Sequence, residues 1–195
     1  MLNLKQHSPL GLIVFILGLL TLGVGIPQAV GNSAHVKSNS ALDKSVMDTL
    51  KQCQNISSSC ADTTKSAAGI LVFPNVVKAD LIIGGAGGKG ALIENGTITG
   101  YYNIGAASAG LQAGIESASQ VYVFRNTEAL SKLKDGSEWK AGATADVALI
   151  EADANTRGTT GNILAYVFDA KGLHAGISLD VFRVWKASQK RPASS

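Results

Sequence analysis

Apolar positions near the start of the chain recur every three or four residues, the spacing typical of an amphipathic helix. These positions are Leu42, Val46, Leu50 and Cys53. They predict a helix over residues 41–53, with Ser40 as its N-cap. We favour packing of this helix on a sheet, and contact with a bilayer is the alternative. A second short helix is predicted over residues 128–134.

The rest of the chain consists of short apolar or alternating runs of strand character. They cover residues 70–73, 79–83, 91–94, 97–103, 104–120 (as one bent strand or two), 121–124, 139–150, 162–168 and 173–185. Pro74 is expected to end the first strand. Asn95-Gly96 and Asp169 to Gly172 are expected to turn two hairpins.

Glycine is concentrated in the middle of the chain, where the strands have to turn or bend. Ten glycines and no proline lie between Gly84 and Gly114 inclusive, and residues 84–90 are expected to form a glycine-rich loop. Glycine allows tight turns and close backbone approach without removing a backbone N–H group. The sequence therefore predicts an α+β fold, with a glycine-rich antiparallel sheet or partly closed β-barrel and two or three packed helices.

The first 31 residues have the order of a secretory signal peptide. Lys5 precedes an apolar run over residues 10–26, and Ala29-Val30-Gly31 offers a small-residue cleavage site. Cleavage after Gly31 is the preferred interpretation. The alternative is a retained membrane anchor, although the apolar run is at the short limit for a span.

The remainder has the length of one domain. We divide it into a disordered N-terminal segment (32–40), a folded domain (41–188) and a disordered tail (189–195). Removal of residues 1–31 would take away one lysine and lower the net charge from +3 to +2. So small a charge, without a dense basic stripe, argues against nucleic acid as a partner.

Cys53 and Cys60 are the two cysteines of the chain, which suits a single disulfide in an exported protein. In one continuous helix their Cα atoms would be about 10.5 Å apart, too far for a disulfide. A disulfide therefore requires the chain to turn within residues 54–59. With no histidine close to them in the sequence, a zinc site is the minor alternative.

Several sequence patterns resemble catalytic or ligand-binding motifs but fail on context. Gly85-x-Gly87-x-x-Gly90 is followed by a hairpin signal where a dinucleotide fingerprint requires a helix. Oxygen-bearing residues over 151–155 lack the glycine and glutamate of an EF-hand, which leaves an irregular calcium site as a minor alternative. His174 has no activated nucleophile in the pattern around it. We therefore expect no enzyme activity, no metal and no cofactor.

Several ordered blocks of the sequence resemble the SYLF domain family. They are AAGILVFPNVVKA, GGAGGKGALI, GYYNIGAASAGLQAG, VYVF and AYVFDAKGLHAGISL, within residues 41–185. The family includes eukaryotic adaptors that bind phosphoinositides and actin, and bacterial envelope proteins described as lipid-binding. The resemblance implies a non-enzymatic protein of the bacterial cell envelope that binds lipid or an anionic phospholipid surface. Together with the signal peptide, it predicts a location in the periplasm or outside the cell, with peripheral attachment to a membrane as one option. The alternative is a protein-interaction module of the envelope.

Basic residues near the predicted loops and the final strand are the candidate contacts for anionic lipid. They are Lys78, Lys89, Lys171, Arg183 and Lys186. If these loops lie at one edge of the sheet, they would form a modest basic face. Binding through such a face should be weak and sensitive to salt.

Overall fold

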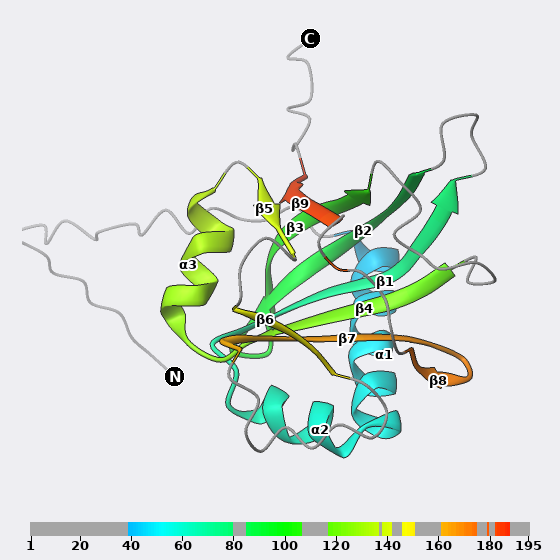
Figure 1. Ribbon diagram of the computed structural model, residues 1–195, viewed down its shortest axis with the longest axis horizontal. Coiled ribbons are helices and arrows are strands. Elements are labelled where there is room, and N and C mark those ends of the chain that lie inside the picture. The colour runs from blue at the N-terminus through cyan, green and yellow to red at the C-terminus, as the bar shows by residue number, and fades with distance from the viewer. Residues whose placement is uncertain are drawn as a thin grey trace, which may run out of the picture. The chain divides into compact units, whose positions relative to one another are not determined.

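The computed structural model describes residues 39–79, 85–106, 117–136, 138–141, 146–150, 161–174, 179 and 182–187 (Figure 1). Most of the predicted N-terminal segments, the candidate calcium loop and the predicted tail lie outside the described residues. The chain divides into two compact units, Met1–Ala34 and His35–Ser195, and every described residue belongs to the second unit. None of the described helices is long and apolar enough to cross a membrane.

Three helices are described, α1 (Ser40–Ile56), α2 (Ser58–Lys65) and α3 (Thr127–Asp135). The N-cap of α1 is Asn39, so the predicted cap, Ser40, is instead the first helical residue. The sequence pattern did not predict α2. The chain leaves the helical conformation at Ser57, whose side chain accepts a hydrogen bond from the backbone N–H of Cys60. This break is the turn that the cysteine spacing requires, and it allows the disulfide between Cys53 and Cys60.

The described strands form one mixed sheet. They are β1 (Gly69–Ala79), β2 (Gly85–Glu94), β3 (Thr97–Ala106), β4 (Ser117–Phe124), β5 (Trp139–Lys140), β6 (Val147–Ile150), β7 (Ile163–Asp169), β8 (Gly172–Leu173) and β9 (Phe182–Lys186). Their order is β5-β9-β3-β2-β1-β4-β7-β6, with β8 paired to β7. Among the described strand pairs, β6 with β7 is parallel and the others are antiparallel. The sheet curls into a half-barrel, which confirms the predicted α+β fold with a partly closed barrel.

The first predicted strand boundary is wrong. Strand β1 does not end at Pro74 but continues through it to Ala79, because the register shifts by a bulge between Val72 and Asn75. A bulge is one of the few places where a strand between two others accepts proline, which has no N–H to donate. Residues 85–90, predicted as loop, are also strand, since they pair with both β1 and β3.

Two further strand predictions are corrected by the topology. Residues 139–150 do not form one strand, because β5 and β6 lie at opposite ends of the sheet order. Residues 173–185 do not form one hairpin arm either. Strand β8 pairs with β7, whereas β9 pairs with β3 and β5 near the other end of the strand order. The pattern identified extended segments correctly but could not identify their partners.

Alternate residues of the strands line two different cores. On one side, here called the α1 face, Ile70 and Val72 share a buried cluster with Val46 of α1. On the other side, the α3 face, Leu71 and Phe73 share a cluster with Leu133 of α3. Since successive strand residues point to opposite faces, α1 and α3 cover opposite faces of the curled sheet.

Candidate functional site

The α1 face carries an exposed row of residues that runs across five strands. Cross-strand pairing places Val77, Gly87, Gly105, Arg183 and Lys140 side by side on β1, β2, β3, β9 and β5. The neighbouring row is Asn75, Lys89, Asn103 and Trp185. Directly paired residues on one face are close enough for their side chains to touch. The two rows therefore form one continuous surface.

Trp185 is the last residue of the second row, and its ring lies over Gly105, the middle residue of the first row. A Cβ atom added to Gly105 would come within 3.0 Å of Trp185 Cη2, so the indole ring lies over a position that has no side chain. Trp185 is 39% exposed and Val77 is 42% exposed, and they are two of the four large apolar side chains that are exposed among the described residues. We call Val77, Lys89, Lys140, Arg183 and Trp185 the Trp185 patch.

The charge of the Trp185 patch is basic. Arg183 Nη1 lies 2.9 Å from Glu138 Oε1, so its charge is partly compensated. Lys89 and Lys140 are exposed and make no ion pair among the described residues. Two uncompensated ammonium groups thus flank an exposed indole ring.

The structure brings only part of the predicted basic face together. Lys89 and Arg183 lie on the Trp185 patch, on adjacent rows. Lys186 pairs with Tyr102 and lies on the opposite, α3 face. Lys171 lies in the turn between β7 and β8, separated from β9 by four strands. Lys78 pairs with Ala86 near the end of β1. Sequence reasoning missed Lys140 and Trp185, because β5 is only two residues long and its partner is not evident locally.

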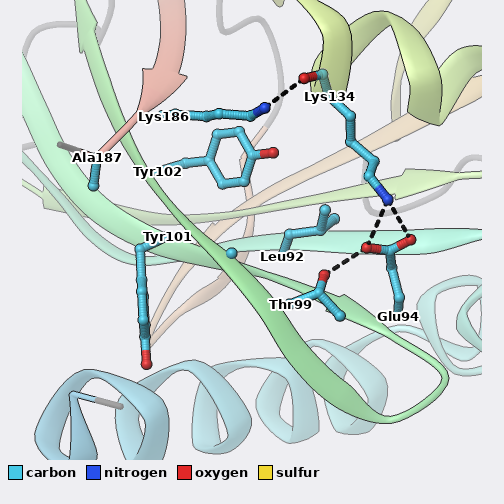
Figure 2. A pocket seen from close by; sticks show the side chains of 9 residues that line it. Leu92, Glu94, Thr99, Tyr101, Tyr102, Lys134, Lys186 and Ala187 are labelled. Carbon is cyan, nitrogen blue, oxygen red and sulfur yellow. Dashed lines mark hydrogen bonds and ion pairs between the residues drawn. The ribbon is translucent and has the colours of Figure 1, made fainter. Parts of the chain in front are cut away.

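A pocket with a volume of about 320 Å³ lies on the α3 face, at the other side of the same strands (Figure 2). The hairpin of β2 and β3 supplies Leu92, Glu94, Thr99 and Tyr102. Lys134 comes from the last turn of α3 and Lys186 from the end of β9. These segments are far apart in sequence and meet because β9 pairs with β3.

Glu94 organises the polar side of this pocket. Lys134 Nζ donates to Glu94 Oε1 at 3.0 Å and to Oε2 at 3.2 Å, and Thr99 Oγ1 donates to Oε2 at 2.5 Å. Partial burial acts to raise the pKa of Glu94. The hydrogen bonds from Thr99 and Lys134, together with the lysine charge, outweigh burial and hold this pKa below its usual value.

Tyr102 and Lys186 form the opposite wall. The Lys186 ammonium donates to the backbone carbonyl of Lys134 at 2.6 Å, at the carboxyl end of α3, where a cation is favoured. Tyr102 is only 3% exposed, and its ring packs across Gly100. Burial, followed by the nearby Glu94 charge, raises the pKa of Tyr102, so its hydroxyl keeps its proton.

Residues 105–191 match the family model of Ysc84, the Las17-binding protein actin regulator. This match agrees with the resemblance to the SYLF domain family that the sequence blocks indicate. The match begins within β3 and includes β9, so it contains Lys140, Arg183, Trp185 and Lys186. A comparison with curated proteins finds no match.

The candidate for catalysis, His174, lies at the end of the β7 and β8 hairpin. Its Nε2 atom is 3.1 Å from Asp169 Oδ2, and Asp169 Oδ1 accepts a hydrogen bond from the backbone N–H of Lys171. That backbone hydrogen bond is the main cause of a lowered pKa for Asp169. Among the described residues, no group of three or more His, Cys, Asp or Glu side chains is placed to hold a metal ion.

Replacement of Glu94 by glutamine is expected to destabilise the domain at pH 7 by about 0.5–1 kcal/mol, the usual size for a partly exposed ion pair. Because the folded pKa lies below the unfolded value, the carboxylate contributes its full stability above pH 4.5. This contribution is lost as the pH falls through the lower, folded pKa. Urea unfolding should show a larger difference between Glu94→Gln and the wild type at pH 7 than at pH 3.

Glu128→Gln is the matched control, because Glu128 lies 3.8 Å from a lysine ammonium but is 84% exposed. It should change the free energy of unfolding little at either pH. An equal loss of unfolding free energy in both variants would show that the contacts of Glu94 stabilise the domain no more than those of an exposed glutamate.

Proposed function

We propose that the chain is a non-enzymatic protein that binds anionic phospholipid surfaces through the Trp185 patch, in a bacterial cell envelope. The observation that supports this most is the cross-strand row that brings Lys140 and Arg183 beside Trp185 and Lys89. Tryptophan is favoured where a membrane meets water, because its ring is apolar and its N–H is polar. Basic side chains next to it would contact the phosphate groups of the lipid.

The expected affinity is modest. Each basic residue near an anionic leaflet contributes about 1 kcal/mol. Of the three basic side chains of the Trp185 patch, Arg183 is paired with Glu138, whereas Lys89 and Lys140 make no ion pair in the described structure. A net charge of +3 for the whole chain provides little long-range attraction. Binding should therefore need anionic lipid and weaken as salt shortens the screening length from about 10 Å at 0.1 M to about 3 Å at 1 M.

We also propose that the chain is exported, to the periplasm or out of the cell. The pattern of residues 1–31 supports this, as does the disulfide between Cys53 and Cys60, a bond that persists in oxidising compartments. Attachment to the membrane would then be peripheral.

Neutralising Lys89 and Lys140 together is expected to weaken binding to anionic vesicles about 30-fold, which corresponds to about 2 kcal/mol for two charges. Binding is measured by flotation of the mature chain, residues 32–195, with vesicles of phosphatidylglycerol and phosphatidylcholine at 0.1 M salt. The double variant Lys89→Gln, Lys140→Gln should keep its melting temperature, since exposed unpaired charges contribute little to stability.

Lys51→Gln combined with Lys171→Gln is the matched control. It removes the same charge from two exposed lysines, one on α1 and one in the β7 and β8 turn. If both double variants lose binding equally, net charge and not the Trp185 patch is responsible. Trp185→Ala should weaken the binding that remains at 0.5 M salt, where the electrostatic part is screened.

A protein partner in the envelope is the second candidate function, because the matched family is described by the binding of a protein, Las17. An acidic protein surface would complement the same lysines. Vesicle flotation separates the two functions, since a protein-specific patch would leave the mature chain unbound even to vesicles rich in phosphatidylglycerol.

A further inference from the structure

The pocket on the α3 face has more free hydrogen-bond donors than acceptors. A lysine ammonium has three donors and no acceptor. Lys186 uses one donor on the carbonyl of Lys134, and Lys134 is directed to the Glu94 carboxylate. The oxygens of Glu94 already accept from Lys134 and Thr99. What the pocket still offers to a ligand is therefore mainly N–H and O–H groups.

The hydroxyl of Tyr102 is the clearest of these groups. It makes no hydrogen bond among the described residues, although the side chain is almost fully buried. Figure 2 shows the hydroxyl pointing into the space between Leu92 and the two lysine side chains. The hydroxyl is not among the fully enclosed polar atoms that lack a partner in the described structure, so it is open to the pocket and free to donate to an acceptor of a ligand.

The charge of the pocket defines the class of ligand. Lys134 and Lys186 each carry a positive charge, and Glu94 compensates only one of them. One positive charge is left, which matches a carboxylate better than a phosphate monoester, whose charge at neutral pH is close to −2. Leu92 and Ala187 add apolar surface beside the charged groups.

We propose that this pocket binds a small carboxylate with a short apolar body, held by the Tyr102 hydroxyl and the Lys186 ammonium. The carboxylate accepts from both donors, and the apolar body lies against Leu92. The site is separate from the Trp185 patch, because Tyr102 and Lys186 lie on the α3 face and Trp185 lies on the α1 face. It therefore does not depend on the proposed membrane binding.

Tyr102→Phe tests the proposal with the smallest possible change. The variant removes one hydroxyl that has no partner in the described protein, so the melting temperature should stay the same. A hydrogen bond to a charged group contributes about 1.5–3 kcal/mol. Binding of benzoate or butyrate to the mature chain should therefore weaken at least tenfold in the variant, as measured by ligand titration of backbone amide chemical shifts at residues 100–102 and 187.

Three comparisons make the outcome decisive. Lys186→Met should also weaken benzoate binding, whereas Lys89→Gln, Lys140→Gln should leave it unchanged while reducing vesicle flotation. Methyl phosphate should bind more weakly than butyrate. The proposal is wrong if neither carboxylate shifts these amides, if Tyr102→Phe binds as tightly as the wild type, or if methyl phosphate binds best. None of these results bears on vesicle flotation, so the two proposals fail separately.

Discussion

Gly90→Ala is expected to destabilise the domain by about 3 kcal/mol or more, at the upper end of the cost of overpacking. A Cβ atom at this position would lie 2.2 Å from the Val72 carbonyl oxygen and 2.5 Å from Phe73 Cδ1. Both contacts belong to the bulged part of β1, where Phe73 is fully buried. The backbone oxygen cannot move away without breaking the sheet. The midpoint of urea unfolding, measured by circular dichroism, should fall sharply.

Gly87→Ala is the matched control on the same strand. The nearest atom to an added Cβ there is the Ile104 carbonyl oxygen at 3.5 Å, an ordinary contact. This substitution should change the free energy of unfolding by less than about 0.5 kcal/mol, as usual for surface positions. Equal unfolding midpoints for the two variants would show that β1 can relax around Gly90 and that the close approach carries no energetic weight.

Gly90 shows what the sequence could and could not reveal about the sheet. The density of glycine indicated close backbone approach, but residues 84–90 were predicted to form a loop. The approach occurs within a paired strand, because the extra residue of β1 at Pro74 brings the two backbones together. A local pattern carries no information about a bulge on a neighbouring strand, so the reason for the glycine was not predictable.

The hairpins show the same limit at longer range. The turn at Asn95-Gly96 was predictable, because this pair favours two-residue turns in which both residues have positive φ. Both residues do have positive φ in the structure. The final strand was predictable as a strand, since Phe182 and Val184 alternate with exposed residues. Its pairing with β3 was not predictable. Strand β8 pairs with β7, whereas β9 lies near the other end of the strand order, and no local sequence signal indicates this change of position.

Both candidate sites depend on that pairing. Strand alternation places Arg183 and Trp185 on one face, but only the register with β3 and β5 brings them to Lys89 and Lys140. The pocket likewise joins the β2 and β3 hairpin to Lys186 through β9. Of its residues, sequence reasoning named Lys186 only. One local signal was available for the others. A hairpin turn at Asn95-Gly96 brings Glu94 close to the threonines of the next strand, so the sequence could have predicted this contact.

Removal of the disulfide is expected to cost about 2.5 kcal/mol. Cys53 and Cys60 are seven residues apart and join α1 to α2 across the break at Ser57. A bond that closes so short a loop restricts the unfolded chain, and the loop-closure relation gives about 2.5 kcal/mol for eight residues. Both cysteines are fully buried on the α1 face, so Cys53→Ala with Cys60→Ala also loses packing of the sulfur atoms.

Reduction separates these two contributions. For the wild type, the difference in unfolding free energy with and without a reductant should equal the contribution of loop closure. The double alanine variant should be insensitive to the reductant. It should also be slightly less stable than the reduced wild type. Two free thiols in the purified mature chain, or an unchanged midpoint on reduction, would contradict the assignment. The loss should also be local. Because Cys53 packs with Val46 and Val72 on the α1 face, amide hydrogens of residues 43–65 should exchange faster after reduction, while those of α3 on the opposite face keep their protection.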